Sequence, residues 1–273
     1  MIRQAWKFML LALIGVAFIS GLTAPFGQAA APGDTLEQIR ARGELRVGLT
    51  NQVPMGMYDP KTQTWSGVGY EISKLVADAI GVKLVVVEST WQNIIPALQT
   101  GKIDIGTAGF YATPQRALAV WFSVPYRYER AGILIRKEDA AKFKALDDFN
   151  KPGLTITAHI GSASEGVVTR YFPKATLKPL STDTVALEVQ AKRVNAWVAD
   201  MGTITAAAKR NPEWAMVWKP AVVFSAVPVV HIVRQGDTNL LMFLNATMEY
   251  YLTQGVIADI EKKYGLTPSL KPQ

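Results

Sequence analysis

The chain has 273 residues, 49% of them hydrophobic, with a formal net charge of +7 and no cysteine. This length suits one large domain or two of ordinary size. The absence of cysteine excludes disulfides, thiolate catalysis, cysteine metal sites and a lipid-anchoring cysteine. The basic residues are spread along the chain without a block interleaved with aromatics, and only two histidines occur. We therefore expect no nucleic-acid partner, no metal and no cofactor.

Residues 1–31 have the pattern of a secretory signal peptide. Arg3 and Lys7 precede an apolar run at residues 8–19, and small residues follow at 29–31. A membrane anchor is the alternative, but the run is short for a span and small residues follow it. We expect cleavage after residue 29, 30 or 31 and export of a soluble protein to the periplasm.

Strands and helices alternate in the first half of the exported chain. Apolar patterning predicts strands at residues 45–49, 84–87 and 103–105. A helical lead-in at 34–40 precedes the first strand, a loop at 51–69 follows it, and further helices are predicted at 72–80 and 94–98. Gly81 and Gly101 end the two later helices. Alternation of this kind implies βαβ units and a parallel sheet.

The same order returns in the second half. Strands are predicted at residues 154–158, 175–178 and 194–198, with helices between them at 161–171 and 184–191. We interpret the chain as an α/β protein of two similar lobes, each a mostly parallel sheet flanked by helices. Lobe 1 comprises residues 32–127 and 228–273, and lobe 2 comprises residues 128–227. Segments near residues 127–130 and 226–230 cross between them as hinges.

Ligands of open α/β sheets bind beyond the carboxyl ends of the strands. In this chain those ends carry Thr50, residues 108–111, residues 161–164 and Asp200. If the lobes face each other, these segments converge on one cleft. Arg116 and Asp200 would then supply opposite charges from opposite lobes.

Arg116 occupies an unfavourable place for a cation. Thr113 is a good N-cap and Pro114 suits the first position of a helix, which puts Arg116 in the first turn. A positive charge there opposes the helix dipole by some tenths of a kcal/mol. The placement is better tolerated if Arg116 meets an anion, either an internal carboxylate or the carboxylate of a ligand.

Asp200 and the serines after Gly161 each allow two interpretations. Asp200 either accepts the ammonium of an amino acid or caps the helix that follows it, and both roles can hold together. Ser162 and Ser164 either cap their helix or belong to an anion-binding helix start.

The roles of the aromatic and histidine side chains near the cleft are also not settled by the sequence. Trp91 either covers a ligand side chain or packs on its own lobe, and Phe110 and Tyr111 add aromatic area. His159 and His231 are expected to be structural histidines with satisfied hydrogen bonds.

Several motifs together resemble one family, the bacterial extracellular solute-binding proteins of family 3, which are amino-acid-binding components of ABC importers. The motifs are Leu-Arg-Val-Gly at residues 45–48, Ile-Ile-Pro-Ala-Leu-Gln at 94–99 with Gly-Lys-Ile-Asp at 101–104, Thr-Pro-Gln-Arg at 113–116, Phe-Ser-Val-Pro-Tyr at 122–126, and residues 255–265. The resemblance covers nearly all the exported chain. It implies a type II periplasmic-binding-protein fold, a small-molecule ligand and a permease partner in the inner membrane. We expect a monomer.

The resemblance also implies residue roles. Arg116 would hold the α-carboxylate of an amino acid and Asp200 its α-ammonium. Gly109 would supply a backbone carbonyl and Ala163 a backbone N–H, while Trp91 would stack on the ligand side chain.

Three single positions and one motif depart from the family pattern. Tyr111 replaces the usual Ser or Thr, Ala163 replaces a frequent Thr, and Thr50 replaces an acid common after the first strand. Gly-Val-Gly at residues 67–69 replaces Gly-Phe-Asp. The missing acid argues against lysine or arginine as the ligand, and Tyr111 favours a small or a flat one.

Two other functions compete with a non-enzymatic binding protein. The resemblance extends to periplasmic cyclohexadienyl dehydratases, which are enzymes on the same scaffold. Such chemistry needs a proton donor near the leaving group, and Glu165 and His159 are the nearest candidates besides Asp200. A sensor that docks on a signalling partner is the other alternative.

Overall fold

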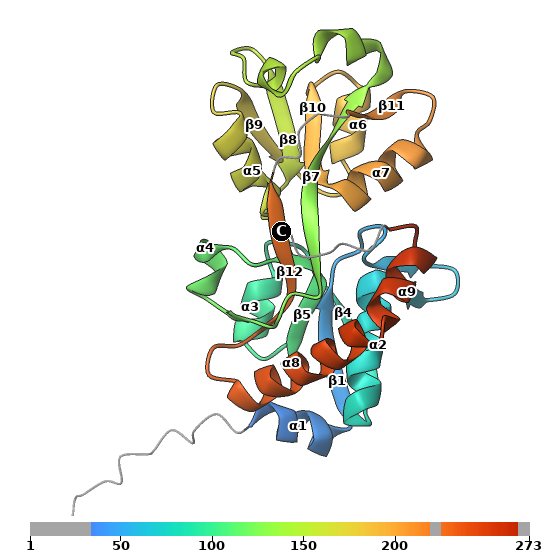
Figure 1. Cartoon of the computed structure of the whole chain (residues 1–273), viewed down its shortest axis with the longest axis vertical. Coiled ribbons are helices and arrows are strands. Elements are labelled where there is room, and N and C mark those ends of the chain that lie inside the picture. The colour runs from blue at the N-terminus through green and yellow to red at the C-terminus, as the bar shows by residue number, and fades with distance from the viewer. Residues whose placement is uncertain (1–33, 219–224, 267–273) are drawn as a thin grey trace, which may run out of the picture. The chain divides into compact units, whose positions relative to one another are not determined.

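The computed structural model describes residues 34–218 and 225–266, and the expected signal peptide lies outside these residues. Lobe 1 begins with the predicted alternation of strands and helices (Figure 1). Its elements before the first crossing are α1 (Thr35–Arg42), β1 (Glu44–Leu49), β2 (Met57–Asp59), β3 (Thr64–Ser66), α2 (Val68–Ile80), β4 (Lys83–Glu88), α3 (Ile94–Gln99), β5 (Ile105–Tyr111), α4 (Pro114–Ala117) and β6 (Trp121–Phe122).

The third strand of lobe 1 differs from its prediction. The sequence places it at residues 103–105, whereas β5 runs from Ile105 to Tyr111. Its first residues pair with β1, and Phe110 and Tyr111 pair with β12, so a second neighbour lengthens the strand. Asp104 lies before β5 and holds Arg46, with Nη2 2.8 Å from Oδ1. As a result, Tyr111 ends a strand instead of lying in a loop.

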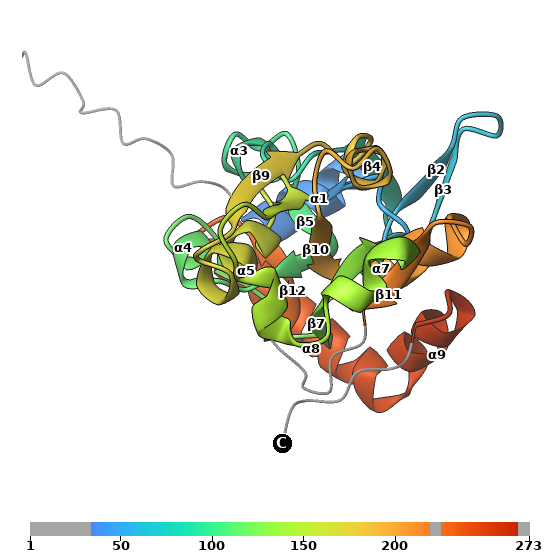
Figure 2. The same ribbon diagram turned by 90° about the horizontal axis from the view of Figure 1, so that it is seen from above.

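The expected loop at residues 51–69 contains a short hairpin. β2 and β3 pair antiparallel, and Tyr58 packs on Trp65 with ring centroids 5.2 Å apart. Figure 2 shows this hairpin extending away from the neighbouring elements. The apolar periodicity misses it because each strand has only three residues.

Two long strands connect the lobes. β7 (Arg127–Arg136) and β12 (Ala226–Val233) run antiparallel, with Ala226 opposite Arg130 and Val229 opposite Arg127. In Figure 1 they lie side by side and continue from one lobe into the other. This confirms the two predicted hinge segments, while the exact lobe boundaries stay a prediction.

Lobe 2 repeats the alternation of strands and helices. Its elements are two 3₁₀ helices, η1 (Lys137–Lys142) and η2 (Leu146–Phe149), then β8 (Thr155–His159), α5 (Ser164–Tyr171), β9 (Thr176–Leu180), α6 (Val185–Gln190), β10 (Ala196–Asp200), α7 (Met201–Arg210) and β11 (Ala215–Trp218). After β12, the chain returns to lobe 1 as α8 (Thr238–Thr253) and α9 (Val256–Lys263). β10 begins two residues later than predicted and reaches Asp200.

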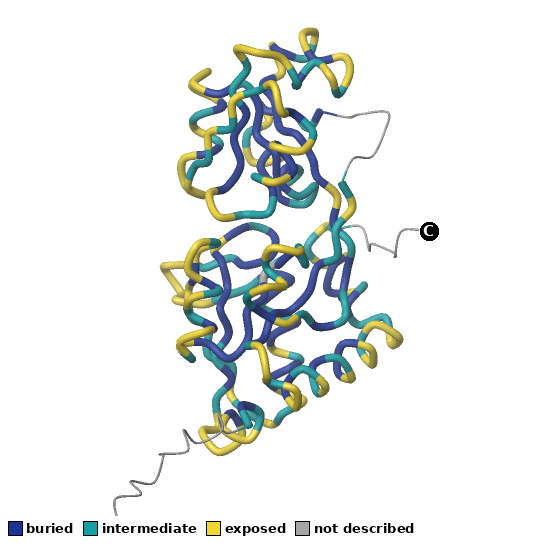
Figure 3. Tube along the Cα trace, turned by 90° about the vertical axis from the view of Figure 1, so that its left-hand side faces the viewer, coloured by how far each residue is buried: buried dark blue, intermediate teal, exposed yellow. Residues whose placement is uncertain are grey.

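The sheet order is β4-β1-β5-β12-β7-β10-β8-β9, with β6 beside β12 and β11 beside β7. Parallel pairs flank an antiparallel centre formed by the crossing strands. Each lobe has its own buried cores: Leu45, Ile72 and Leu244 belong to lobe 1, and Ile133, Phe149 and Val198 to lobe 2. Figure 3 shows buried residues in the interior of each lobe. The predicted two-lobe α/β architecture is thus confirmed.

Candidate functional site

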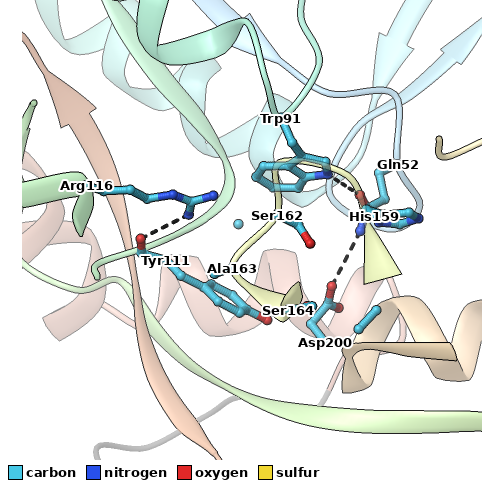
Figure 4. Close-up of a pocket in the computed structure, with 11 residues that line it drawn as sticks. Gln52, Trp91, Tyr111, Arg116, His159, Ser162, Ala163, Ser164 and Asp200 are labelled. Carbon is cyan, nitrogen blue, oxygen red and sulfur yellow. Dashed lines mark hydrogen bonds between the residues drawn. The ribbon is translucent and has the colours of Figure 1, made fainter. Parts of the chain in front are cut away.

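A narrow cavity lies where the strand ends of the two lobes meet, with about 280 Å³ of space between protein atoms, part of it open to solvent. Figure 4 shows the side chains directed into it. The residues that line it are Gln52, Trp91, Gly109, Tyr111, Arg116, His159, Ser162, Ala163, Ser164, Ala199 and Asp200. The structure therefore brings together eight of the nine residues predicted from the sequence.

Thr50 is the exception, because it does not line the cavity. Its side chain is buried at the end of β1, and its hydroxyl has no protein partner among the described residues. The chain turns after β1 and directs Gln52 to the cavity wall instead, so a role of Thr50 in ligand binding stays a prediction.

Arg116 forms the basic end of the cavity. Thr113 caps α4 as predicted, accepting from the backbone N–H of Arg116 at 3.3 Å. The guanidinium stands 4.0 Å over the ring of Phe110 and donates to two carbonyls at 3.2 Å, those of Tyr111 and Gly161. Burial lowers the pKa of Arg116 to about 10, so it stays charged at neutral pH. Among the described residues, none of the ion pairs involves Arg116, which removes the support for an internal carboxylate partner.

Asp200 forms the acidic end. It caps α7, with Oδ1 accepting from the backbone N–H of Thr203 at 2.7 Å, which confirms the capping role. Its side chain stays partly exposed to the cavity, so capping leaves it available to a ligand. Burial raises the pKa of Asp200 above its usual range, against the hydrogen bonds from Thr203 that lower it.

Gln52 is a cavity residue that the sequence analysis missed. Its Oε1 accepts from Trp91 Nε1 at 3.0 Å, and its Nε2 donates to Thr203 Oγ1 at 2.7 Å and to Asp200 Oδ2 at 3.4 Å. One amide thus fixes the indole of lobe 1 and reaches the acidic end in lobe 2. Gln52 lies in the loop after β1, which has no periodic pattern, so the sequence offered no sign of this role.

The start of α5 brings backbone close to the opposite lobe. Gly161 has φ +77°, and its backbone N–H donates to the carboxylate of Glu165. Neither Ser162 nor Ser164 caps the helix, and Ser162 Oγ has no protein partner in the described part of the chain. The N-capping alternative for these serines is therefore wrong, and Ser162 is directed into the cavity (Figure 4).

Gly109 and Tyr111 supply the β5 side of the wall. Gly109 has φ +82°, and its N–H donates to Tyr126 Oη at 3.2 Å. Tyr111 is buried, and its hydroxyl has no hydrogen-bond partner among the described residues. Burial first, and then the charges of Asp200 and Glu129, raise the pKa of Tyr111 well above its usual value, so the hydroxyl keeps its proton.

His159 also lines the cavity, at the end of β8. Burial lowers its pKa to about 4, so the ring is neutral at physiological pH. Its Nε2 has no hydrogen-bond partner among the described residues, so the expectation of a fully satisfied structural histidine is wrong.

Within residues 34–218 and 225–266, no cluster of His, Asp and Glu side chains is arranged to hold a metal ion. In the same ranges, no helix has the length and apolar character needed to span a bilayer.

Two lobes, two crossing strands and a charged cavity between them define a two-lobed ligand-binding protein of the type II periplasmic fold. The model of the bacterial extracellular solute-binding proteins, family 3, matches residues 45–267. The chain belongs to this family, which confirms the resemblance drawn from the sequence motifs.

Relatives of known name include binding proteins and enzymes. The glutamine-binding protein of an ABC transporter from Bacillus subtilis is 24% identical over 96% of this chain and 97% of its own length. Cyclohexadienyl dehydratase from Pseudomonas aeruginosa is 27% identical over 143 residues, which are 52% of each chain. The chain spans about half the length, or less, of several curated relatives that it matches, this dehydratase among them.

Solved structures of similar proteins cover most of the chain. An ancestral amino acid-binding protein, described as a precursor of cyclohexadienyl dehydratase, has 33% identity and a TM-score of 0.78, covering 84% of this chain and 99% of its own. A substrate-binding protein of an amino acid ABC transporter from Streptococcus pneumoniae, bound to L-arginine, has 25% identity and a TM-score of 0.78, covering 86% and 99%.

Proposed function

We propose that this protein binds a free amino acid between its lobes in the periplasm and delivers it to an ABC importer of the inner membrane. The observation that carries the proposal is a pair of opposite charges at the two ends of one cavity, one from each lobe. Arg116 has no carboxylate partner among the described residues, and Asp200 faces the same space. A zwitterion whose carboxylate and ammonium groups are attached to the same carbon matches this arrangement.

The α-carboxylate of the ligand would bind the Arg116 guanidinium, a pairing that favours two parallel hydrogen bonds. The backbone N–H of Ala163 would add a donor. The α-ammonium would bind Asp200 and the carbonyl of Gly109. Trp91, held by its hydrogen bond to Gln52, would cover the ligand side chain.

The cavity favours a short side chain without charge. Arg116 and Asp200 are the two charged residues that line it, and both are assigned to the ends of the amino acid. A lysine or arginine side chain would need another carboxylate, and Thr50 does not supply one. Three neutral groups line the cavity instead, and each has a polar atom without a hydrogen-bond partner in residues 34–218 and 225–266: Ser162 Oγ, Tyr111 Oη and His159 Nε2.

We propose a non-enzymatic role. A dehydratase needs a proton donor directed at the leaving group, and the carboxylate that lines the cavity, Asp200, is assigned to the ammonium. Glu165 is engaged by the N–H of Gly161. Incubating the purified protein with prephenate and arogenate tests the alternative, and formation of the aromatic product would overturn the non-enzymatic assignment.

The central experiment compares amino-acid binding by the wild type and Arg116→Ala. A thermal-shift screen of amino acids identifies the ligand, and calorimetry then measures its affinity. Losing one partner of a buried charged pair costs about 2–5 kcal/mol, so affinity should fall at least about thirtyfold.

Arg210→Ala serves as the matched control, because Arg210 is exposed at the end of α7. Circular dichroism checks that both variants fold. If no amino acid binds the wild type, or if folded Arg116→Ala binds as tightly as the control, the proposed function is contradicted.

A further inference from the structure

The Phe-Ser-Val-Pro-Tyr motif at residues 122–126 contacts the cavity wall without lining the cavity itself. It begins in β6, ends just before β7 and runs beside β12. The backbone N–H of Ser123 donates to the carbonyl of His231 at 3.0 Å, and Ser123 Oγ accepts from the N–H of His231 at 2.9 Å. Both backbone groups of His231 on β12 are thus bound by one residue of the motif.

The pairing of β5 with β12 is irregular opposite His231. On either side of it the strands pair regularly, Phe110 with Val230 and Gly106 with Ile232. Residues 107–109 of β5 therefore lie opposite His231 alone, whose backbone groups are bound by Ser123. Extra residues on one strand form a β-bulge, which bends the strand and redirects its groups. This bulge ends at Gly109, which lines the cavity.

Gly109 has a backbone conformation outside the strand region. Its φ of +82° lies where glycine is favoured, whereas residues of an antiparallel strand have φ of about −140°. Its N–H donates to Tyr126 Oη at 3.2 Å. The Tyr126 side chain is 2% exposed, and its ring packs on that of His231 with centroids 5.0 Å apart. The motif thus holds the bulge at two points, through Ser123 and through Tyr126.

The carbonyl of Gly109 is directed away from β12. The N–H of Ala112 donates to the Pro228 carbonyl of β12 at 3.1 Å. N–H groups two residues apart on a strand point the same way, so that of Phe110 also faces β12. In a trans peptide the carbonyl points opposite to the N–H, so the Gly109 carbonyl faces the β1 side. Because the pairing of β5 with β1 ends at Gly106, this carbonyl meets the space beyond the end of β1, where the cavity lies.

We propose that Tyr126 is a positioning residue for the ligand. By accepting the Gly109 N–H, it fixes the bulge in the conformation that presents the Gly109 carbonyl to the ammonium of the amino acid. The inference rests on the proposed function, since it needs an ammonium at this carbonyl. Without the hydroxyl, the N–H of Gly109 loses its partner. Glycine also adopts negative φ readily, so its carbonyl would no longer be held in one direction.

The Gly109 carbonyl can be observed by itself, because Gly-Phe occurs once in the chain, at residues 109–110. Protein labelled with carbon-13 at the glycine carbonyls and nitrogen-15 in phenylalanine therefore gives one carbonyl–amide correlation. L-glutamine and L-arginine are titrated first, followed by any other amino acid that shifts the melting temperature. Saturation of the wild type should move the Gly109 carbonyl resonance downfield, because the carbonyl accepts a new hydrogen bond. Saturated Tyr126→Phe should show a smaller shift.

Calorimetry with the same amino acids measures the effect on affinity. Tyr126→Phe should bind at least about tenfold more weakly, because an oriented hydrogen bond to the charged ammonium is lost. Tyr250→Phe removes the hydroxyl of an exposed tyrosine on α8 and should match the wild type in affinity and in the Gly109 resonance. Circular dichroism checks that both variants fold.

The outcomes separate this inference from the proposed function. The inference alone is overturned if the wild type binds an amino acid without a shift of the Gly109 resonance. It is also overturned if folded Tyr126→Phe equals Tyr250→Phe in affinity or in that shift. If the wild type binds no amino acid, the proposed function is contradicted. Hydrogen exchange at the Gly109 amide, slow in the wild type and faster in Tyr126→Phe, then still decides whether Tyr126 fixes the bulge.

Discussion

At the scale of single residues, the side-chain amide group of Gln52 has two structural roles. Its carbonyl fixes the indole of Trp91, and its amino group contacts Thr203 and Asp200 across the cavity. The longer contact is 3.4 Å to Asp200 Oδ2, the carboxylate oxygen that does not accept the capping hydrogen bond from Thr203. Gln52 therefore orients the aromatic wall and connects the lobes at the same point.

We expect Gln52→Ala to bind ligand about fivefold more weakly while remaining folded. A hydrogen bond between neutral groups contributes about 1 kcal/mol, and the bond to Thr203 is lost in the variant. Calorimetry with the amino acid found in the screen measures the change. Gln254→Ala, at an exposed position after α8, is the matched control, and equal affinities of the two variants would exclude a role for Gln52.

The sequence revealed those site residues that carry a local pattern. Arg116 and Asp200 stand at helix starts, where a cation after Thr113-Pro114 and an acid after an apolar strand are unusual enough to notice. Gln52 has no such pattern, because its partners Trp91, Thr203 and Asp200 come from segments far away in the chain. Thr50 does not line the cavity, because a turn, and not the strand it follows, determines which side chain reaches it.

At the scale of elements, the segment before α5 meets the segment after β4 across the cavity. A Cβ at Gly161 would lie 3.0 Å from the backbone nitrogen of Gln92 and 3.1 Å from the carbonyl carbon of Trp91. Gly161 belongs to lobe 2 and the other two residues to lobe 1. Glycine at this position thus allows the lobes to approach.

We expect Gly161→Ala to weaken ligand binding more than it weakens folding. Alanine at positive φ costs about 1–2 kcal/mol at any site, and at Gly161 its methyl group would also hold the lobes apart. Gly153→Ala is a close control, because Gly153 has φ +84° and a methyl group there would meet no heavy atom within 4 Å beyond its chain neighbours. Similar melting temperatures with a clear loss of affinity only in Gly161→Ala would support the close approach, and parallel affinities would refute it.

Element types were predictable wherever strands and helices had strong periodicity, as in α2 with its apolar face and its glycine end. Boundaries failed where pairing between distant strands decides them. β5 extends to Tyr111 because β12, more than a hundred residues later, pairs with its end. The β2–β3 hairpin was missed for the opposite reason, since its strands are too short to show alternation.

At the scale of the whole described molecule, hydrogen bonds rather than ion pairs join the lobes across the cavity. Gln52 contacts Thr203, and Arg116 contacts the carbonyl of Gly161. Each contributes about 1 kcal/mol, somewhat more for the charged donor, so the lobes of the empty protein are held together only weakly. The hinge strands β7 and β12 would absorb the backbone rotation of an opening motion.

A ligand that bridges Arg116 and Asp200 gains both charged contacts only when the lobes are together, and this differential affinity shifts the equilibrium towards closure. We therefore expect a smaller radius of gyration for the saturated protein than for the empty one, measured by small-angle scattering. Asp200→Asn should remain more open at the same ligand concentration, because it binds the ammonium less tightly. Closure would also present one combined surface of both lobes to a permease. If calorimetry confirms tight binding and both states give the same compact scattering profile, closure around the ligand is refuted.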